Sequence, residues 1–145
     1  MSLTKQDVFD IALTHIRQQG KPSVALNEDG TMRELYEDCP ICLYRGDGGL
    51  QCAAAPLITK YDPQMDNHEY SSDISFSSIY ADFGPDHFIE GLTHPLANFA
   101  SRELQVAHDR SAKDQLSGRA DFLEAYEERM RRIAEAHDLE YSEPA

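Results

Sequence analysis

Tryptophan is absent from this sequence of 145 residues, which removes one common anchor for protein partners and sugars. Long apolar runs are absent too, because charge, proline or glycine interrupts each one within about six residues, far short of a membrane span. The three cysteines are too few, and odd in number, for a disulfide framework. The first residues lack the apolar core of a signal peptide. We therefore expect a cytoplasmic protein that does not bind membranes.

Basic residues are scarce. The chain has 13 lysines and arginines against 26 acidic residues, for a net charge of −13. Because proteins bind nucleic-acid phosphates through lysine and arginine, this balance predicts no binding to nucleic acid. The charge still permits binding to a basic protein, to a cation, or to a protein surface that normally binds DNA.

The length and the periodicity of apolar residues predict one domain over residues 1–145. Apolar positions recur at helical spacing over 4–19, 95–110 and 117–137. A glycine-rich turn within 41–52 favours a β-hairpin. The predicted fold class is therefore α-rich α+β, with about three helices packed on a small hairpin.

Local signals set the expected bounds of these elements. Thr4 is suited to cap the first helix, and Gly20 to stop it. Ser117 is suited to cap the last helix. The solvent-exposed face of that helix is expected to carry the ion pairs Glu127–Arg131 and Glu128–Arg132. Residues 21–40 are predicted to be irregular. Residues 52–58 are predicted to form a short buried helix that Pro56 limits.

The middle of the chain has an unusual charge pattern. No lysine or arginine occurs between Lys60 and Arg102, whereas seven acidic residues and several aromatic ones do. That aromatic content is too high for an ordinary disordered linker. We predict an ordered, acidic, loop-rich excursion at about 62–94 within the single domain.

Three cysteines form the first candidate site. Cys39 and Cys42 have the spacing with which two thiolates can reach one zinc ion, and Cys52 and His68 could complete the set. Redox chemistry is a second interpretation. The favoured alternative is that Cys42 and Cys52 are small buried residues on facing strands. No metal or cofactor is predicted from this set.

The glycine-rich segment 44–52 is the second candidate. Its backbone N–H groups could cradle an anion that Arg45 clamps, although the segment lacks the ending of a phosphate-binding Walker loop. The alternative is a purely structural turn. Arg45-Gly46-Asp47 would indicate cell adhesion only in an extracellular protein, and nothing in the sequence indicates one.

Two further sets are open to a functional and to a plain interpretation. Cys52, His108 and Asp109 could form a nucleophilic triad, or His108 could be a cation near a helix C-terminus beside a solvated acid. A set of acids and histidines in the middle segment could bind a cation or a basic partner, or could be a solvated face. This second set comprises Asp62, Asp66, His68, Glu69, Asp73, Asp82, Asp86 and His87.

Several motifs of this sequence resemble those of a group of small proteins from phages and prophages. The resemblance is carried by Tyr44-Arg45-Gly46, Gly49 to Ala53, Leu57-Ile58, Tyr61 to Met65, and Leu104-Gln105 with His108-Asp109. It touches residues 4–20, 42–66 and 96–139, whereas the acidic segments 27–40 and 67–92 look like additional material. The group has no established activity, so the resemblance implies phage ancestry and little chemistry.

The sequence therefore favours a non-enzymatic phage or prophage accessory protein that binds a host protein or a small-molecule ligand. A counter-defence role, through DNA mimicry or sequestration of a signalling molecule, is one specific form of this hypothesis. The alternatives are a cysteine- or metal-dependent enzyme and a structural or assembly component. The predicted ligand-binding residues are Tyr44, Arg45, Gly46, Gly49, Cys52, Tyr61, His108 and Asp109.

Overall fold

The computed structural model describes residues 2–67 and 75–144. Two short antiparallel strands, β1 (Glu34–Tyr36) and β2 (Cys39–Pro40), form the hairpin. The helices are α1 (Lys5–Gln19), α2 (Phe76–Phe83), α3 (His94–Phe99), α4 (Val106–Leu116) and α5 (Phe122–His137). The predicted α-rich α+β class is confirmed.

Helix α1 begins and ends as predicted. The Thr4 hydroxyl accepts a hydrogen bond from the Asp7 backbone N–H, and the Asp7 carboxylate accepts one from the Thr4 N–H. This reciprocal capping satisfies two backbone donors that the first turn would leave unpaired. Gly20 ends the helix in the left-handed conformation, at φ 71°.

The predicted helix over 95–110 is part of a longer rod. A six-residue π-helical segment, Ala100–Gln105, joins α3 to α4 without a break, and α4 continues to Leu116. Here Ser117 is the C-cap of α4, so its predicted role as an N-cap is wrong. Gly118, at φ 75°, turns the chain, and Asp121 caps α5 instead.

Two ion pairs were predicted on the wet face of α5, and one of them forms. Glu128 contacts Arg132 at 3.1 Å. The predicted Glu127–Arg131 pair does not form. Glu127 is buried and forms a bidentate pair with Arg17 of α1 at 2.6 and 2.8 Å. A buried carboxylate needs a partner on the side facing the protein, and α1 provides it.

The strand pair is not at the predicted position. It lies in the segment predicted to be irregular, and Asp38, at φ 58°, makes the turn between β1 and β2. Within 41–52 the pairing is reduced to one bridge, between Arg45 and Gln51. The reason is competition: Cys42 bridges to Val24, and the Gln19 side chain of α1 binds the backbone of Gln51.

The acidic middle segment contributes to the core. Helix α2, which was not predicted, buries Phe76, Ile79 and Tyr80. The predicted short buried helix over 52–58 is present as the 3₁₀ turn Ala55–Leu57. The described residues include no helix that could cross a bilayer.

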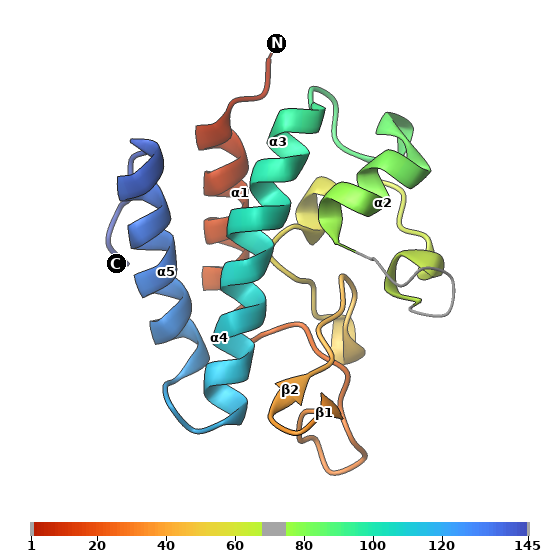
Figure 1. The fold of residues 1–145 in the computed structure, drawn as a ribbon, viewed down its shortest axis with the longest axis vertical. Coiled ribbons are helices and arrows are strands. Elements are labelled where there is room, and N and C mark those ends of the chain that lie inside the picture. The colour runs from red at the N-terminus through yellow and green to blue at the C-terminus, as the bar shows by residue number, and fades with distance from the viewer. Residues whose placement is uncertain (1, 68–74, 145) are drawn as a thin grey trace.

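Three helices stand side by side in Figure 1: α5, α1 and the α3–α4 rod, which passes in front of α1. Helix α2 and the loops between residues 44 and 67 lie on the other side of the rod, and the hairpin lies beside its lower end. One cluster of buried apolar side chains joins these parts, with Phe9, Phe76, Phe122 and Tyr126 among its largest members. The rod thus has one face on the core and one face toward the hairpin.

Candidate functional site

A groove of about 680 Å³ lies between the hairpin and the rod. Leu35 and residues 39–44 form one side, and residues 75–77 at the start of α2 close one end. The opposite side is one face of the rod over residues 101–113. Its volume is in the range of small-ligand and peptide sites.

Seven rod residues line this groove, and we call the four exposed ones the groove wall: Arg102, Val106, Arg110 and Lys113. Their spacing of four, four and three residues keeps them on one face of a helix. The π-helical segment, a type of helix irregularity frequent at functional sites, contains Arg102 and ends just before Val106. All four residues are exposed.

The three cations of the groove wall are unpaired. The side chains of Arg102, Arg110 and Lys113 make no ion pair or hydrogen bond with any residue in the described part of the chain. By contrast, Arg17, Arg129, Arg131 and Arg132 all pair with carboxylates. In a chain with twice as many acids as bases, this concentration of unpaired cations on one surface is the clearest charge anomaly.

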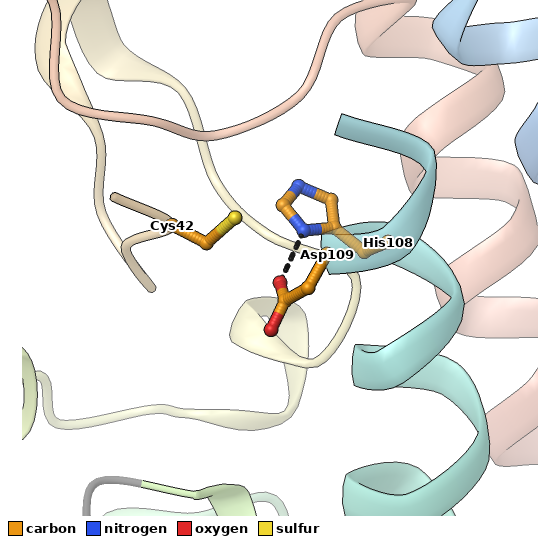
Figure 2. A group of neighbouring side chains, drawn as sticks. All are labelled: Cys42, His108 and Asp109. Atoms are coloured by element: carbon orange, nitrogen blue, oxygen red, sulfur yellow. Dashed lines mark hydrogen bonds and ion pairs between the residues drawn. The ribbon is translucent and has the colours of Figure 1, made fainter. Parts of the chain in front are cut away.

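Cys42, His108 and Asp109 form a cluster where the segment after β2 meets α4 (Figure 2). Cys42 comes from the segment after β2, and its sulfur points toward the two α4 residues. The ligand-type atoms of the three side chains lie within 4.8 Å of one another. Asp109 lines the groove, whereas the His108 side chain is fully buried.

The hydrogen bonds of His108 fix its protonation pattern. Its Nε2 accepts from the backbone N–H of Ser23 at 2.9 Å, so Nε2 carries no proton. Its Nδ1 lies 2.9 Å from Asp109 Oδ1 and therefore donates its proton to that carboxylate. A metal ion on Nδ1 would leave the ring without any proton, so this donor set fits a hydrogen-bond network better than a metal centre.

The Cys42 thiol is held in its protonated form. Burial, followed by the charge of Asp109 and a hydrogen bond to it, raises the pKa of Cys42 well above its ordinary value. Reactive cysteines require the opposite shift, toward the thiolate, which a neighbouring cation or helix N-terminus provides. The cluster therefore lacks an activated nucleophile.

The polar network extends beyond the cluster. The Gln105 amide donates to Asp109 Oδ1 at 2.9 Å and accepts from the Ala54 backbone N–H at 3.3 Å. Together with the contact between His108 and Ser23, these bonds attach the rod to two separate loops. The network fixes the orientation of the rod, and hence of the groove wall.

Cys52, the predicted triad nucleophile, is buried in the core. Burial, with a smaller contribution from the charge of Asp109, raises the pKa of its thiol well above the ordinary value. The thiol in the cluster with His108 and Asp109 is that of Cys42. Cys52 thus has the surroundings of a structural cysteine.

Residues of the 44–66 motif meet at one carboxylate. Asp66 accepts hydrogen bonds from the Tyr44 N–H at 2.7 Å, the Arg45 N–H at 3.1 Å and the Tyr61 hydroxyl at 2.6 Å. The Arg45 guanidinium lies 4.5 Å from the centre of the Tyr61 ring. We call Tyr44, Arg45, Tyr61 and Asp66 the Asp66 hub.

Close packing and backbone conformation explain the two glycines beside the hub. A Cβ on Gly46 would lie 2.7 Å from Ser23 Oγ and 2.9 Å from the backbone N and O of Val24. Gly49 has φ 81°, which turns the chain after the exposed Asp47. The Asp47 carboxylate in turn accepts from the Leu26 N–H at 2.9 Å.

The structure distributes the eight predicted ligand residues over several environments. Tyr44 and Asp109 line the groove, whereas Arg45, Gly46, Gly49, Cys52, Tyr61 and His108 do not. Cys39 and Cys42 both line it, but His68, proposed to complete a metal set, lies outside the described residues.

The described members of the acidic set do not gather at the groove either. Asp62 caps a 3₁₀ turn, Asp66 belongs to the hub, and Asp82 and Asp86 are exposed. Glu69 and Asp73, like His68, lie outside the described residues.

Sequence reasoning missed the groove wall. A signal was present: three bases at helical spacing from residue 102 to residue 113, directly after a long stretch without any. No family model, no curated protein and no solved structure matches the chain.

Proposed function

We propose that this chain is a non-enzymatic binding protein whose ligand lies in the groove between the hairpin and the rod. One observation carries the proposal: the groove wall combines an exposed apolar residue with three cations that have no partner among the described residues. Binding sites combine apolar surface with a few polar groups that are available to the ligand. The groove offers both.

The chemistry beside the groove supports binding over catalysis. The Cys42 thiol is protonated, His108 donates to Asp109 through Nδ1, and Nε2 is occupied by the Ser23 N–H. No basic nitrogen of His108 is left to take a proton from a substrate or from a thiol. The cysteine-dependent enzyme therefore remains the weaker alternative.

The biological setting of this binding protein rests on the resemblance to phage and prophage proteins. An accessory role that engages a host protein or a small ligand is consistent with the groove. Counter-defence is one form of that role, and the groove favours sequestration over DNA mimicry because its wall is basic. A structural or assembly component would not need an accessible groove with unpaired cations.

The test is a ligand titration monitored by nuclear magnetic resonance. The labelled protein is titrated with an acidic peptide, a basic peptide, a mononucleotide and a cyclic dinucleotide. We expect at least one of them to shift the backbone signals of Leu35, Ile41 and Val106. Val106→Trp, which fills the groove, should abolish these shifts, whereas Arg119→Trp, outside the groove, should not.

Two outcomes would contradict the proposal. One is that no ligand class shifts the groove signals, or that shifts map to the Asp66 hub instead. The other is chemical conversion of a ligand during the titration that is lost in Cys42→Ser, which would support the enzyme alternative. Chemical denaturation of each variant verifies that it is folded.

A further inference from the structure

We propose that the groove binds a short acidic peptide segment of a partner protein, with one acidic side chain at each end of an apolar stretch. This inference rests on the proposed function and adds the chemical class of the ligand. Three features of the groove lead to it: the spacing of its cations, the apolar surface between them, and the charge of the rest of the chain.

The spacing of the cations defines two anion positions. Arg110 and Lys113 are three residues apart, so they are neighbours on one helix face and can share one carboxylate. Arg102 lies eight residues before Arg110, which is roughly 12 Å along a helix at about 1.5 Å per residue. Two acids separated by three residues in an extended peptide span about 13 Å, which matches this distance.

Apolar side chains fill the interval between the two anion positions. Val106 lies midway between Arg102 and Arg110 on the rod and is 36% exposed. Leu35 lines the groove from the hairpin side and is 55% exposed. These are two of the three large apolar residues exposed on the described chain, and both face this groove. The three residues between the two acids of the peptide should therefore be apolar.

Asp109 provides a polar anchor inside the groove. Its side chain is 44% exposed, and its Oδ1 already accepts from His108 and Gln105. A carboxylate can accept further hydrogen bonds, and backbone N–H groups of a peptide are suitable donors. Because the network already fixes the orientation of Asp109, its side chain loses little conformational freedom when a peptide binds.

The net charge selects a short ligand. The cations act at contact distance, whereas the field of the whole chain, at a net charge of −13, repels anions that approach over a large surface. At physiological ionic strength the Debye length is about 8 Å, so a peptide with two acids is exposed mainly to the local cations. A long polyanion such as duplex DNA would extend over the acidic surface as well.

The experiment uses a synthetic peptide with blocked ends, a fluorophore, and carboxylates at its first and fifth positions around three apolar residues. Fluorescence anisotropy measures its binding to the full chain. We expect saturable binding that Arg110→Glu with Lys113→Glu weakens by about tenfold or more. The matched pair Lys21→Glu with Arg119→Glu makes the same change in net charge outside the groove and should alter affinity less than about twofold.

Peptide controls test the chemistry. Replacing both carboxylates by amides should remove binding, and placing the two acids next to each other should weaken it, because Arg102 then loses its partner. Equal binding of all three peptides would overturn the inference, since neither charge nor spacing would then matter.

The outcomes separate this inference from the proposed function. If the cyclic dinucleotide shifts the groove signals and no acidic peptide does, the groove binds a ligand but the peptide inference is overturned. If none of the four ligand classes does, both fail. Sedimentation of the protein alone provides another check: self-association that Arg110→Glu with Lys113→Glu abolishes would make a second copy the occupant and would also overturn it.

Discussion

The Asp66 hub and the groove wall differ in what their polar groups contact. At the hub, the Asp66 carboxylate receives three donors from residues 44, 45 and 61. On the groove wall, three cations have no partner in the described regions of the chain. The hub contains the recognisable sequence motif, whereas the wall has none.

The difference shows why a motif need not mark a ligand site. Tyrosine, arginine and glycine beside an acidic turn are suited to ligand binding, but the same groups are suited to holding two loops together. Internal hydrogen bonds at the hub satisfy these groups, so a ligand would have to displace them at a cost of roughly 1–3 kcal/mol for each broken bond. The groove wall requires no such exchange. This difference supports the proposed position of the binding site, at the groove wall.

The largest effect on stability is expected where the rod is anchored below the groove. His108→Ala leaves the Ser23 N–H without its acceptor, removes one of the donors to the Asp109 carboxylate, and creates a cavity beside Phe122. We expect the free energy of unfolding to fall by about 3–5 kcal/mol. Urea denaturation measures this change.

The exposed His94, at the start of the same rod, is the matched control, and His94→Ala should cost less than about 1 kcal/mol. Equal midpoints for the two variants would mean that the buried network does not anchor the rod. The groove wall would then have no fixed frame, and the distinction between the two regions would lose its basis.

Helices α1 and α5 could be predicted from sequence because their signals are local, whereas α2, within the acidic middle segment, was not predicted. Thr4, Asp7 and Gly20 define α1 through contacts within one turn, and the apolar stripe of α5 is continuous. The hairpin could not be placed because its position depends on long-range competition. Val24 and Gln19 take the backbone partners that a hairpin over 41–52 would have used.

The candidate site was harder to predict than the fold. Asp109 lines a groove, whereas its neighbour His108 is buried. This difference depends on the orientation of the rod, and that orientation is determined by contacts between residues 51 and 85 positions apart in the sequence. Sequence spacing alone also did not distinguish Cys42 from Cys52 as the thiol near His108. The unpaired state of three bases is a property of their surroundings and has no sequence motif.

Gly46→Ala tests the structural role of the glycine turn beside the hub. Its φ of −86° suits any residue, so the expected penalty comes only from the collision of Cβ with Ser23 and Val24. We expect a loss of about 2–3 kcal/mol in unfolding free energy, because backbone atoms cannot move aside as a side chain can. Gly48→Ala is the control: it meets open space and, at φ 76°, should cost about 1 kcal/mol. The opposite ranking of the two losses would show that close packing against Val24 is not what requires Gly46.

Tyr61→Phe removes one donor from the hub and keeps the ring under Arg45. The lost hydrogen bond to a carboxylate should cost about 1–2 kcal/mol at neutral pH. Burial and the hydrogen bond to Asp66 raise the pKa of Tyr61 in the folded state above its ordinary value of about 10. The stabilisation is therefore complete below pH of about 10 and is lost as the pH rises through the folded pKa.

The difference in unfolding free energy between the wild type and Tyr61→Phe should accordingly shrink above pH of about 10. Buried Tyr126 and half-buried Tyr141 also have raised pKa values, but both proteins retain them, so their effects cancel in the difference. Tyr36→Phe, on an exposed side chain, should change stability by less than about 0.5 kcal/mol. A difference that grows in alkali would contradict the assigned contact between Tyr61 and Asp66.

The smallest effect on stability is expected at the groove wall. Arg110→Glu with Lys113→Glu alters two exposed side chains that have no partner among the described residues, so no folded-state contact is lost. The added negative charge increases repulsion in an acidic chain, and Lys21→Glu with Arg119→Glu adds the same amount elsewhere. We expect the unfolding free energies of the two double variants to agree within about 0.5 kcal/mol. A selective loss of 2 kcal/mol or so in the groove variant would mean that these cations support the fold as the Asp66 hub does. Agreement, together with the loss of peptide binding, would show that the groove wall is not required for folding and is available for a ligand.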